Sequence, residues 1–133
     1  MNIGQAAAAS GLSAKMIRHY EQSGLIQPTS RSDAGYRRYQ SKDIEILKFI
    51  RRARLLGFPL ADIAGLLALW QNPKRSNTAV KQVAQHHLQQ VELKLQELQA
   101  MKHTLQQTIA QCAGDGGADC AILQHLTDDS TKA

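Results

Sequence analysis

The sequence predicts a mainly α-helical protein, in which an N-terminal winged helix-turn-helix domain precedes a long coiled-coil helix and a C-terminal loop with a short helix. Three observations predict this fold class. Apolar residues recur at helical spacing through the first 72 positions, residues 77–111 contain neither Gly nor Pro, and the only two cysteines enclose a short loop of small and acidic residues. We therefore divide the chain into residues 1–72, 73–111 and 112–133.

Two short helices separated by a tight turn are expected at the start of the chain. The apolar spacing breaks at Ser10-Gly11, and Ser13 can cap a second helix that ends near Ser23-Gly24. Residues 31–39 then have the pattern of a tight hairpin turned at residues 33–35. This hairpin is the expected wing.

Two further helices are expected after the wing. Ser41 is the expected cap of the first, which Gly57 ends. Pro59 suits the first turn of the second, which Asn72-Pro73 closes. The N-terminal part is thus expected to be an all-helical unit with one hairpin.

The segment 77–111 carries a heptad pattern. Its seam positions recur in steps of three and four, with one polar break at Lys102: Leu88, Val91, Leu95, Leu98, Lys102, Leu105 and Ile109. A helix of this length would extend about 50 Å at 1.5 Å per residue, so its apolar stripe needs a partner. We expect two copies of the chain to associate through this stripe as an antiparallel or parallel pair, and the alternative is a helix that folds back on its own domain.

Charge and composition limit the function classes. Residues 1–57 hold ten Lys or Arg against four acids, whereas residues 58–133 hold six against seven. The basic half is therefore the expected polyanion-binding face. The length leaves little room for a catalytic pocket between domains, so an enzyme is not expected. With no leader or membrane span evident, we expect a cytoplasmic protein without membrane contact.

The basic residues concentrate on two elements that a winged helix-turn-helix presents to double-stranded DNA. Cations there neutralise phosphates, and a helix in the major groove can contact base edges. The alternative is a solvated charged face. The candidates on the second helix and the wing are Lys15, Arg18, Arg31, Tyr36, Arg37 and Arg38.

Cys112 and Cys120 are the candidate metal ligands. Soft thiolates favour Cu(I) and similar ions, and a monovalent d¹⁰ ion is satisfied by two of them, whereas zinc normally requires four ligands. Two thiolates on a +1 ion leave a net negative charge, which the N-terminus of a helix capped by Asp119 can partly stabilise. His125 lies nearby as a further candidate, and a chance pair or a redox disulfide is the alternative.

The N-terminal motifs resemble the MerR family of transcription regulators. They are Asn2-Ile3-Gly4, Ser13-Ala-Lys-Met-Ile-Arg-His-Tyr-Glu21, Gly24-Leu25-Ile26, Gly35-Tyr-Arg-Arg-Tyr39 and Arg54-Leu-Leu-Gly-Phe58. The resemblance implies a dimer on a promoter with an overlong spacer, where DNA distortion brings the promoter elements into register for RNA polymerase. The DNA contacts it implies are Lys15, Arg18, Tyr20, Tyr36 and Arg37, with a core role open for Tyr20.

The cysteine loop resembles that of the CueR branch of this family, the sensors of monovalent copper, silver and gold. The resemblance implies activation of copper efflux or detoxification genes, with Lys81 near the metal. Asn77 stands where divalent-metal sensors of the family carry a third cysteine from the partner subunit. The copper branch often has Pro at the position of Ala113. The resemblance therefore leaves the choice between copper and gold open. A thiol-based redox regulator and a DNA binder without an effector are the alternatives.

Overall fold

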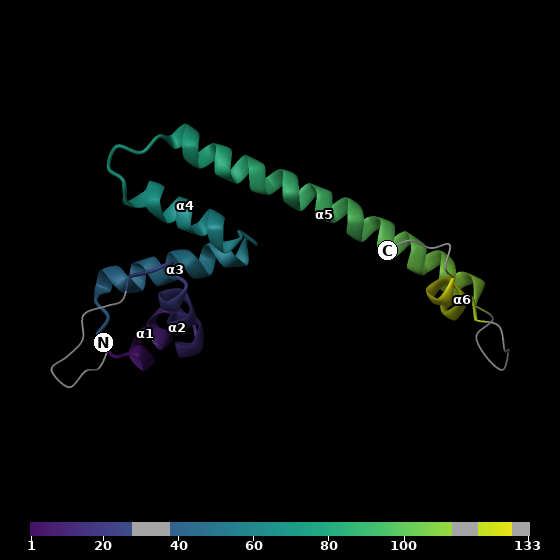
Figure 1. The fold of residues 1–133 in the computed structure, drawn as a ribbon, viewed down its shortest axis with the longest axis horizontal. Helices are drawn as coiled ribbons and strands as arrows, with labels where there is room; N and C mark the ends of the chain where they lie inside the picture. Colours follow the sequence, from purple (N-terminus) through teal and green to yellow (C-terminus); the bar gives the residue numbers. More distant parts are fainter. Residues whose placement is uncertain (28–37, 113–119, 129–133) are drawn as a thin grey trace. The chain divides into compact units, whose positions relative to one another are not determined.

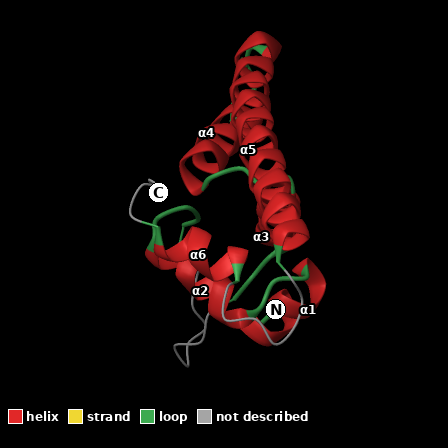
Figure 2. Cartoon of the chain, turned by 90° about the vertical axis from the view of Figure 1, so that its right-hand side faces the viewer, coloured by secondary structure: helices red, strands yellow, loops and turns green. Residues whose placement is uncertain are grey.

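A computed structural model describes residues 1–27, 38–112 and 120–128. All regular secondary structure in these residues is helical, which confirms the predicted mainly α-helical class (Figure 2). The chain divides into two compact units, Met1–Ala84 and Gln85–Ala133. The predicted wing lies largely outside the described residues. None of the described helices is long and apolar enough to cross a membrane.

The predicted helix-turn-helix is formed by α1 (Ile3–Ser10) and α2 (Ala14–Gln22). Asn2 caps α1, because its side-chain Oδ1 accepts the Gln5 N–H at 2.8 Å. The turn requires Gly11, which has a φ of 82° and lies so close to α3 that a Cβ would be 2.9 Å from Arg51 Nε. Ser13 caps α2 as expected, since its Oγ accepts the Met16 N–H at 3.1 Å.

The next two helices are α3 (Ser41–Leu55) and α4 (Leu60–Gln71). The sequence predicted Ser41 as the cap of α3, and this prediction was wrong. Ser41 is the first residue of the helix. Gln40 occupies the N-cap position, and its backbone N–H donates to Asp43 Oδ2 at 2.8 Å. The carboxylate of the third helical residue thus satisfies the backbone N–H of the N-cap residue. Gly57 follows α3 with a φ of 84°, and Pro59 occupies the N-cap position of α4.

Helix α3 is the centre of the first unit, because it contacts both α1 and α4 (Figure 1). It contributes Ile44 and Leu47 to a core cluster with α1 and α2, and Ile50 and Ala53 to a second cluster with α4. The rest of the buried apolar residues in these clusters are Ala6, Ile17, Tyr20, Tyr39, Phe58, Ile63 and Leu67. The core is mostly aliphatic, and it holds α2 firmly against α3.

A buried polar pair ties α2 to the segment that precedes α3. The Tyr39 hydroxyl donates to Glu21 Oε1, and both side chains are buried. Tyr39 also exchanges backbone contacts with the N-terminus: its N–H donates to the Met1 carbonyl at 2.7 Å, and the Met1 amino group donates to the Tyr39 carbonyl at 2.9 Å. These bonds fix the position of Tyr39 relative to α2 and to the N-terminus.

We expect Tyr39→Phe to lower the free energy of unfolding by about 1–3 kcal/mol, because the buried Glu21 carboxylate loses a hydrogen-bond donor. Tyr20→Phe is the matched control: Tyr20 is equally buried, but no hydrogen bond of its hydroxyl is described. Urea denaturation of both variants measures the difference. Equal stability of Tyr39→Phe and the wild type would contradict this role of the pair.

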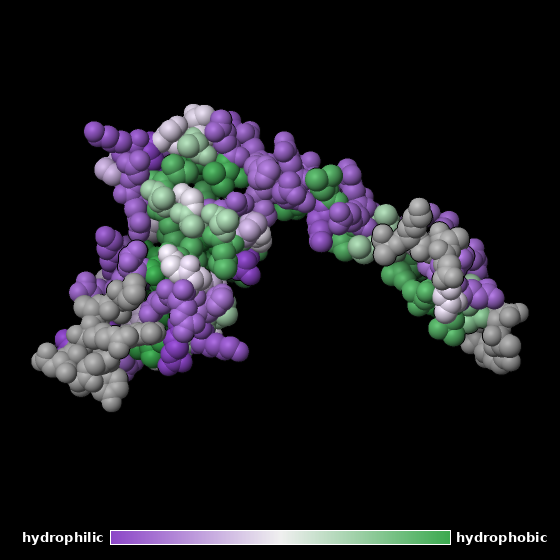
Figure 3. Space-filling model, viewed as in Figure 1, coloured by the Kyte–Doolittle hydropathy of each residue, from purple (hydrophilic) through white to green (hydrophobic). Residues whose placement is uncertain are grey.

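The long helix α5 (Asn77–Gln111) has the predicted bounds, and α6 (Ala121–Thr127) follows the cysteine loop. The apolar seam residues of α5 between Leu88 and Ile109 are exposed, with 38% to 59% of their surface accessible. Apolar surface accordingly interrupts the hydrophilic surface along α5 (Figure 3). Exposed leucines in such a regular pattern are typical of a helix whose partner is a separate chain.

Candidate metal site and DNA-binding surface

The ends of two helices bring the cysteines together. Cys112 directly follows α5, and Cys120 occupies the N-cap position of α6. The two Sγ atoms are 3.6 Å apart, and both cysteines are free thiols with partly buried side chains. The predicted cap Asp119 lies outside the described residues, and the residue at the N-cap position is Cys120.

The start of α6 favours the thiolate form of Cys120. The backbone N–H of Leu123, the Cys112 thiol and the backbone N–H of Ile122 all lower the pKa of Cys120 below its ordinary value. The unpaired amides of a first helical turn stabilise a neighbouring negative charge, as do thiol donors. The N-terminus of α6 therefore favours a negative charge on one of the two sulfur atoms, that of Cys120.

The donor set fits a soft monovalent ion. Among the described residues, no third His, Cys, Asp or Glu joins the pair to make a group of three, and His125 is exposed on α6. Two thiolates suit a monovalent d¹⁰ ion, whereas a zinc ion would need two more ligands. The pair would hold the ion, and the amides of α6 would offset the negative charge.

We expect alkylation of Cys120 by iodoacetamide to show a lower pH midpoint in the folded protein than in the urea-unfolded chain. The thiolate is the reactive form, and a lowered pKa keeps that form populated at lower pH. Quenched samples, digested and analysed by mass spectrometry, give the midpoint for the Cys120 peptide. Identical midpoints in the two states would mean that α6 does not stabilise the thiolate.

Asn77 and Lys81, the residues predicted to lie around the metal, occupy the first two turns of α5 and are exposed. Cys112 follows the opposite end of the same helix. Thirty-five residues of helix correspond to about 52 Å. The role of Asn77 and Lys81 at the metal site therefore stays a prediction.

The candidate DNA-binding residues of α2 are divided by burial. Lys15 and Arg18 are exposed, while Ile17 and Tyr20 are buried in the core, so α2 presents its basic face outward. Tyr20 is only 2% exposed, which favours the core role over the predicted DNA contact. The wing candidates Arg31, Tyr36 and Arg37 lie outside the described residues, whereas Arg38 is described and exposed.

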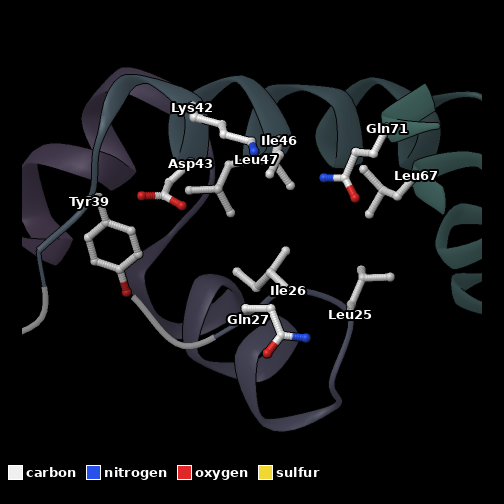
Figure 4. A pocket seen from close by; sticks show the side chains of 10 residues that line it. All are labelled: Leu25, Ile26, Gln27, Tyr39, Lys42, Asp43, Ile46, Leu47, Leu67 and Gln71. Atoms are coloured by element: carbon white, nitrogen blue, oxygen red, sulfur yellow. The ribbon is translucent and has the colours of Figure 1, made fainter. Parts of the chain in front are cut away.

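A cavity of about 440 Å³ lies in the first unit, between α3, α4 and the segment that follows α2 (Figure 4). Half of its lining residues are aliphatic, and both helices contribute polar groups: Leu25, Ile26, Gln27, Tyr39, Lys42, Asp43, Ile46, Leu47, Leu67 and Gln71. This lining includes no thiol or imidazole, so the cavity offers no soft ligand to a metal ion.

Comparison with known families identifies the chain. The model of the MerR HTH family regulatory proteins matches residues 1–69, and the model described as MerR, DNA binding, matches residues 44–108. The chain belongs to the MerR family. This confirms the resemblance that the N-terminal motifs indicated. Since MerR proteins are DNA-binding transcription regulators, the expectation that the chain is not an enzyme is also confirmed.

Similar proteins cover nearly the whole chain. Heavy metal-dependent transcription regulator 2 of Rhizobium meliloti is 44% identical over 132 residues, 99% of this chain and 90% of that protein. The regulator CueR of Vibrio cholerae is 43% identical over 126 residues, 95% of this chain and 91% of that protein. The structure of PbrR691 from Ralstonia metallidurans, in complex with lead(II), matches with a TM-score of 0.82 at 30% identity, covering 95% and 98% of the two chains.

The buried pair of Glu21 and Tyr39 was not predicted from the sequence. Both stand in motifs that resemble the family, but nothing in their spacing shows that residues 18 positions apart form a buried hydrogen bond. A carboxylate at the end of a helix that otherwise presents basic residues is the signal that could have drawn attention to Glu21.

Proposed function

We propose that the chain is a metal-responsive transcription activator, which binds promoter DNA as a homodimer and responds to Cu(I), or to Ag(I) or Au(I), held by Cys112 and Cys120. The observation that carries this proposal is the cysteine pair: two thiols 3.6 Å apart, one with a lowered pKa, and no third ligand among the described residues. A bound ion would supply a fixed link between the end of α5 and the start of α6.

The relatives support a metal effector but not one particular metal. Several are named as heavy metal-dependent regulators or as CueR, while PbrR691 was solved with lead(II). The choice of a monovalent ion is supported by the two-thiol donor set and by Asn77, which stands where divalent-metal sensors of the family carry a third cysteine.

Activation is proposed to occur through DNA shape. The dimer would hold an overlong promoter spacer, and the metal-bound form would bend and untwist it so that RNA polymerase can engage both promoter elements. Contacts from the two basic domains would offset a deformation cost of about 1–6 kcal/mol. The residues that would bind the duplex are those of α2 and the wing, which carry five of the ten Lys and Arg residues in positions 1–57.

Anaerobic titration with Cu(I), at free metal concentrations set by a competing chelator, tests the metal site. We expect one ion per cysteine pair, and Cys120→Ser should abolish binding at the same free concentration. His125→Ala is the control, because His125 is exposed and joins no group of three potential ligands. Binding that requires His125, or a stoichiometry of one ion per two pairs, would overturn the two-thiolate site.

We expect Arg18→Ala to weaken binding to promoter DNA and to reduce the slope of log K against log salt by about 2. Each phosphate contact contributes about 0.9 to this slope, and a dimer would lose two contacts. Lys94→Ala is the control, since Lys94 is an exposed cation on α5. Fluorescence anisotropy across a salt series measures both effects, and an unchanged slope would remove Arg18 from the interface.

The runner-up is a redox-sensing regulator of the same fold. Thiols 3.6 Å apart with a lowered pKa at Cys120 also favour disulfide formation, in which two thiols lose two protons and two electrons to an oxidant such as a peroxide. Native mass spectrometry of protein purified without oxygen separates the two hypotheses. Retained metal supports the sensor, whereas a two-dalton loss after mild peroxide that switches transcription supports the redox regulator.

A further inference from the structure

We propose that Glu21 and Tyr39 are positioning residues for DNA recognition, because their buried hydrogen bond sets the angle at which α2 presents Lys15 and Arg18 to the duplex. The inference rests on the DNA contacts of the proposed function but not on its metal response. It follows from the way α2 is held, from the place of the carboxylate in that helix and from the fixed position of Tyr39.

Helix α2 is short and is held mainly by one face. Its buried residues are Ile17, Tyr20 and Glu21, which share a face because they are three and four positions apart. The exposed Lys15 and Arg18 are three positions apart on another face. The apolar packing of Ile17 and Tyr20 is not directional, so it resists separation of α2 from the core better than it resists a tilt.

A small tilt of α2 would misplace its cations. Lys15 lies six residues before Glu21, which corresponds to about 9 Å of helix. A tilt of about 10° at the Glu21 end would move Lys15 by about 1.6 Å, whereas a binding site tolerates displacements of about 0.5 Å. The orientation of α2 thus decides whether its exposed face meets the edges of particular bases.

The carboxylate of Glu21 supplies the direction that apolar contacts lack. A hydrogen bond weakens steeply when donor and acceptor are misaligned, so the bond from the Tyr39 hydroxyl to Glu21 Oε1 restricts the tilt of α2. The carboxylate is unfavourable there in two ways: it is buried, and it lies in the last turn of α2, at the negative end of the helix dipole. An apolar side chain would avoid both costs, so stability does not account for a glutamate at this position.

Tyr39 is a fixed reference point for this bond. Its side chain is 2% exposed, its backbone N–H donates to the Met1 carbonyl at 2.7 Å, and the next residue, Gln40, is the N-cap of α3. The Tyr39 hydroxyl is thereby held relative to the starts of α1 and α3. Its hydrogen bond to Glu21 fixes α2 in the same frame.

The same tyrosine positions a further cation. Burial alternates along the segment before α3, where Arg38 and Gln40 are exposed and Tyr39 between them is buried. Neighbouring side chains of an extended segment point in opposite directions, so the inward anchor at Tyr39 presents Arg38 outward. One buried hydrogen bond therefore couples the orientation of Arg38 to that of the cations on α2.

A comparison of specific with non-specific DNA binding tests this role. Contacts to phosphates do not depend on sequence, whereas contacts to bases require the correct orientation of α2. We expect Tyr39→Phe and Glu21→Met each to weaken binding to the promoter fragment about tenfold, and to leave binding to an unrelated duplex of equal length within about twofold of the wild type. Fluorescence anisotropy, at a temperature where circular dichroism shows each variant folded, measures both affinities.

Two control variants separate positioning from stability. Ile63→Val removes one buried methylene from α4 and breaks no hydrogen bond, so it lowers the stability but should keep the ratio of the two affinities. Glu21→Gln keeps an oxygen that accepts the Tyr39 hydroxyl and should keep the ratio within about threefold. An unchanged ratio in Tyr39→Phe, or an equal fall in Ile63→Val, would overturn the positioning role.

The double variant tests whether the two residues act through one bond. Glu21→Met combined with Tyr39→Phe should bind the promoter fragment no more weakly than Glu21→Met alone, because the bond is already lost. A loss of about 100-fold, the product of the two single effects, would contradict the inference. A wild type that binds the promoter fragment and the unrelated duplex equally would instead refute promoter recognition and hence the proposed function.

Discussion

Replacing Cys112 with serine is expected to abolish the transcriptional response to Cu(I) while leaving promoter affinity within about twofold of the wild type. The hydroxyl of serine is a hard, weakly acidic ligand, so the remaining thiolate of Cys120 cannot hold a soft monovalent ion alone. DNA affinity should persist because the basic face of α2 belongs to the first unit, Met1–Ala84. The measurement is run-off transcription with and without metal, beside anisotropy on the same promoter fragment.

The outcomes of this substitution are distinguishable. A variant that still responds to metal would show that the cysteine pair is not the sensor. A variant that loses DNA binding as well would show that Cys112 is structural, consistent with its place at the end of α5. Circular dichroism controls for folding, because α5 accounts for much of the helical signal.

Leu98→Asp is expected to convert the dimer to a monomer at micromolar concentration and to weaken promoter binding by about 100-fold or more. In the dimer each copy would place a carboxylate in the apolar seam, where desolvation of an unpaired charge is unfavourable. Loss of one subunit removes the gain from binding two half-sites together. Sedimentation equilibrium and anisotropy measure the two effects.

Leu93→Asp provides the matched control on the same helix. Leu93 and Leu98 are almost equally exposed in the single chain, at 54% and 52%, but Leu93 lies off the seam. The control should remain dimeric. If both variants stay dimeric, α5 does not mediate dimerisation, and if both are monomeric, the effect comes from charge on the helix and not from the seam.

Local signals in the sequence were sufficient for the helices. The absence of Gly and Pro from 77 to 111 gave the bounds of α5, and Ser13 was correctly assigned as a cap because its hydroxyl acts on an amide three residues away. Ser41 failed as a cap because Gln40 and Asp43 satisfy the helix start together, an alternative with similar chemistry one residue earlier.

Features that depend on distant packing were not predictable. A tyrosine on a helix that carries DNA-binding cations can point either to the groove or to the core, and the burial of Tyr20 depends on α3 and α4, which pack around it. The Glu21–Tyr39 hydrogen bond depends in the same way on packing between residues that are 18 positions apart in the sequence. The cysteines were predictable as a pair because only seven residues separate them in the sequence.

The most direct test of the proposed function is metal-dependent transcription from a promoter with an overlong spacer, assayed with Cu(I), Au(I) and Zn(II) side by side. The two-thiolate site predicts activation by the monovalent ions and none by Zn(II), with the response lost in Cys112→Ser and when the spacer is shortened to the ordinary length. Activation by Zn(II), or equal transcription with and without metal, would contradict it.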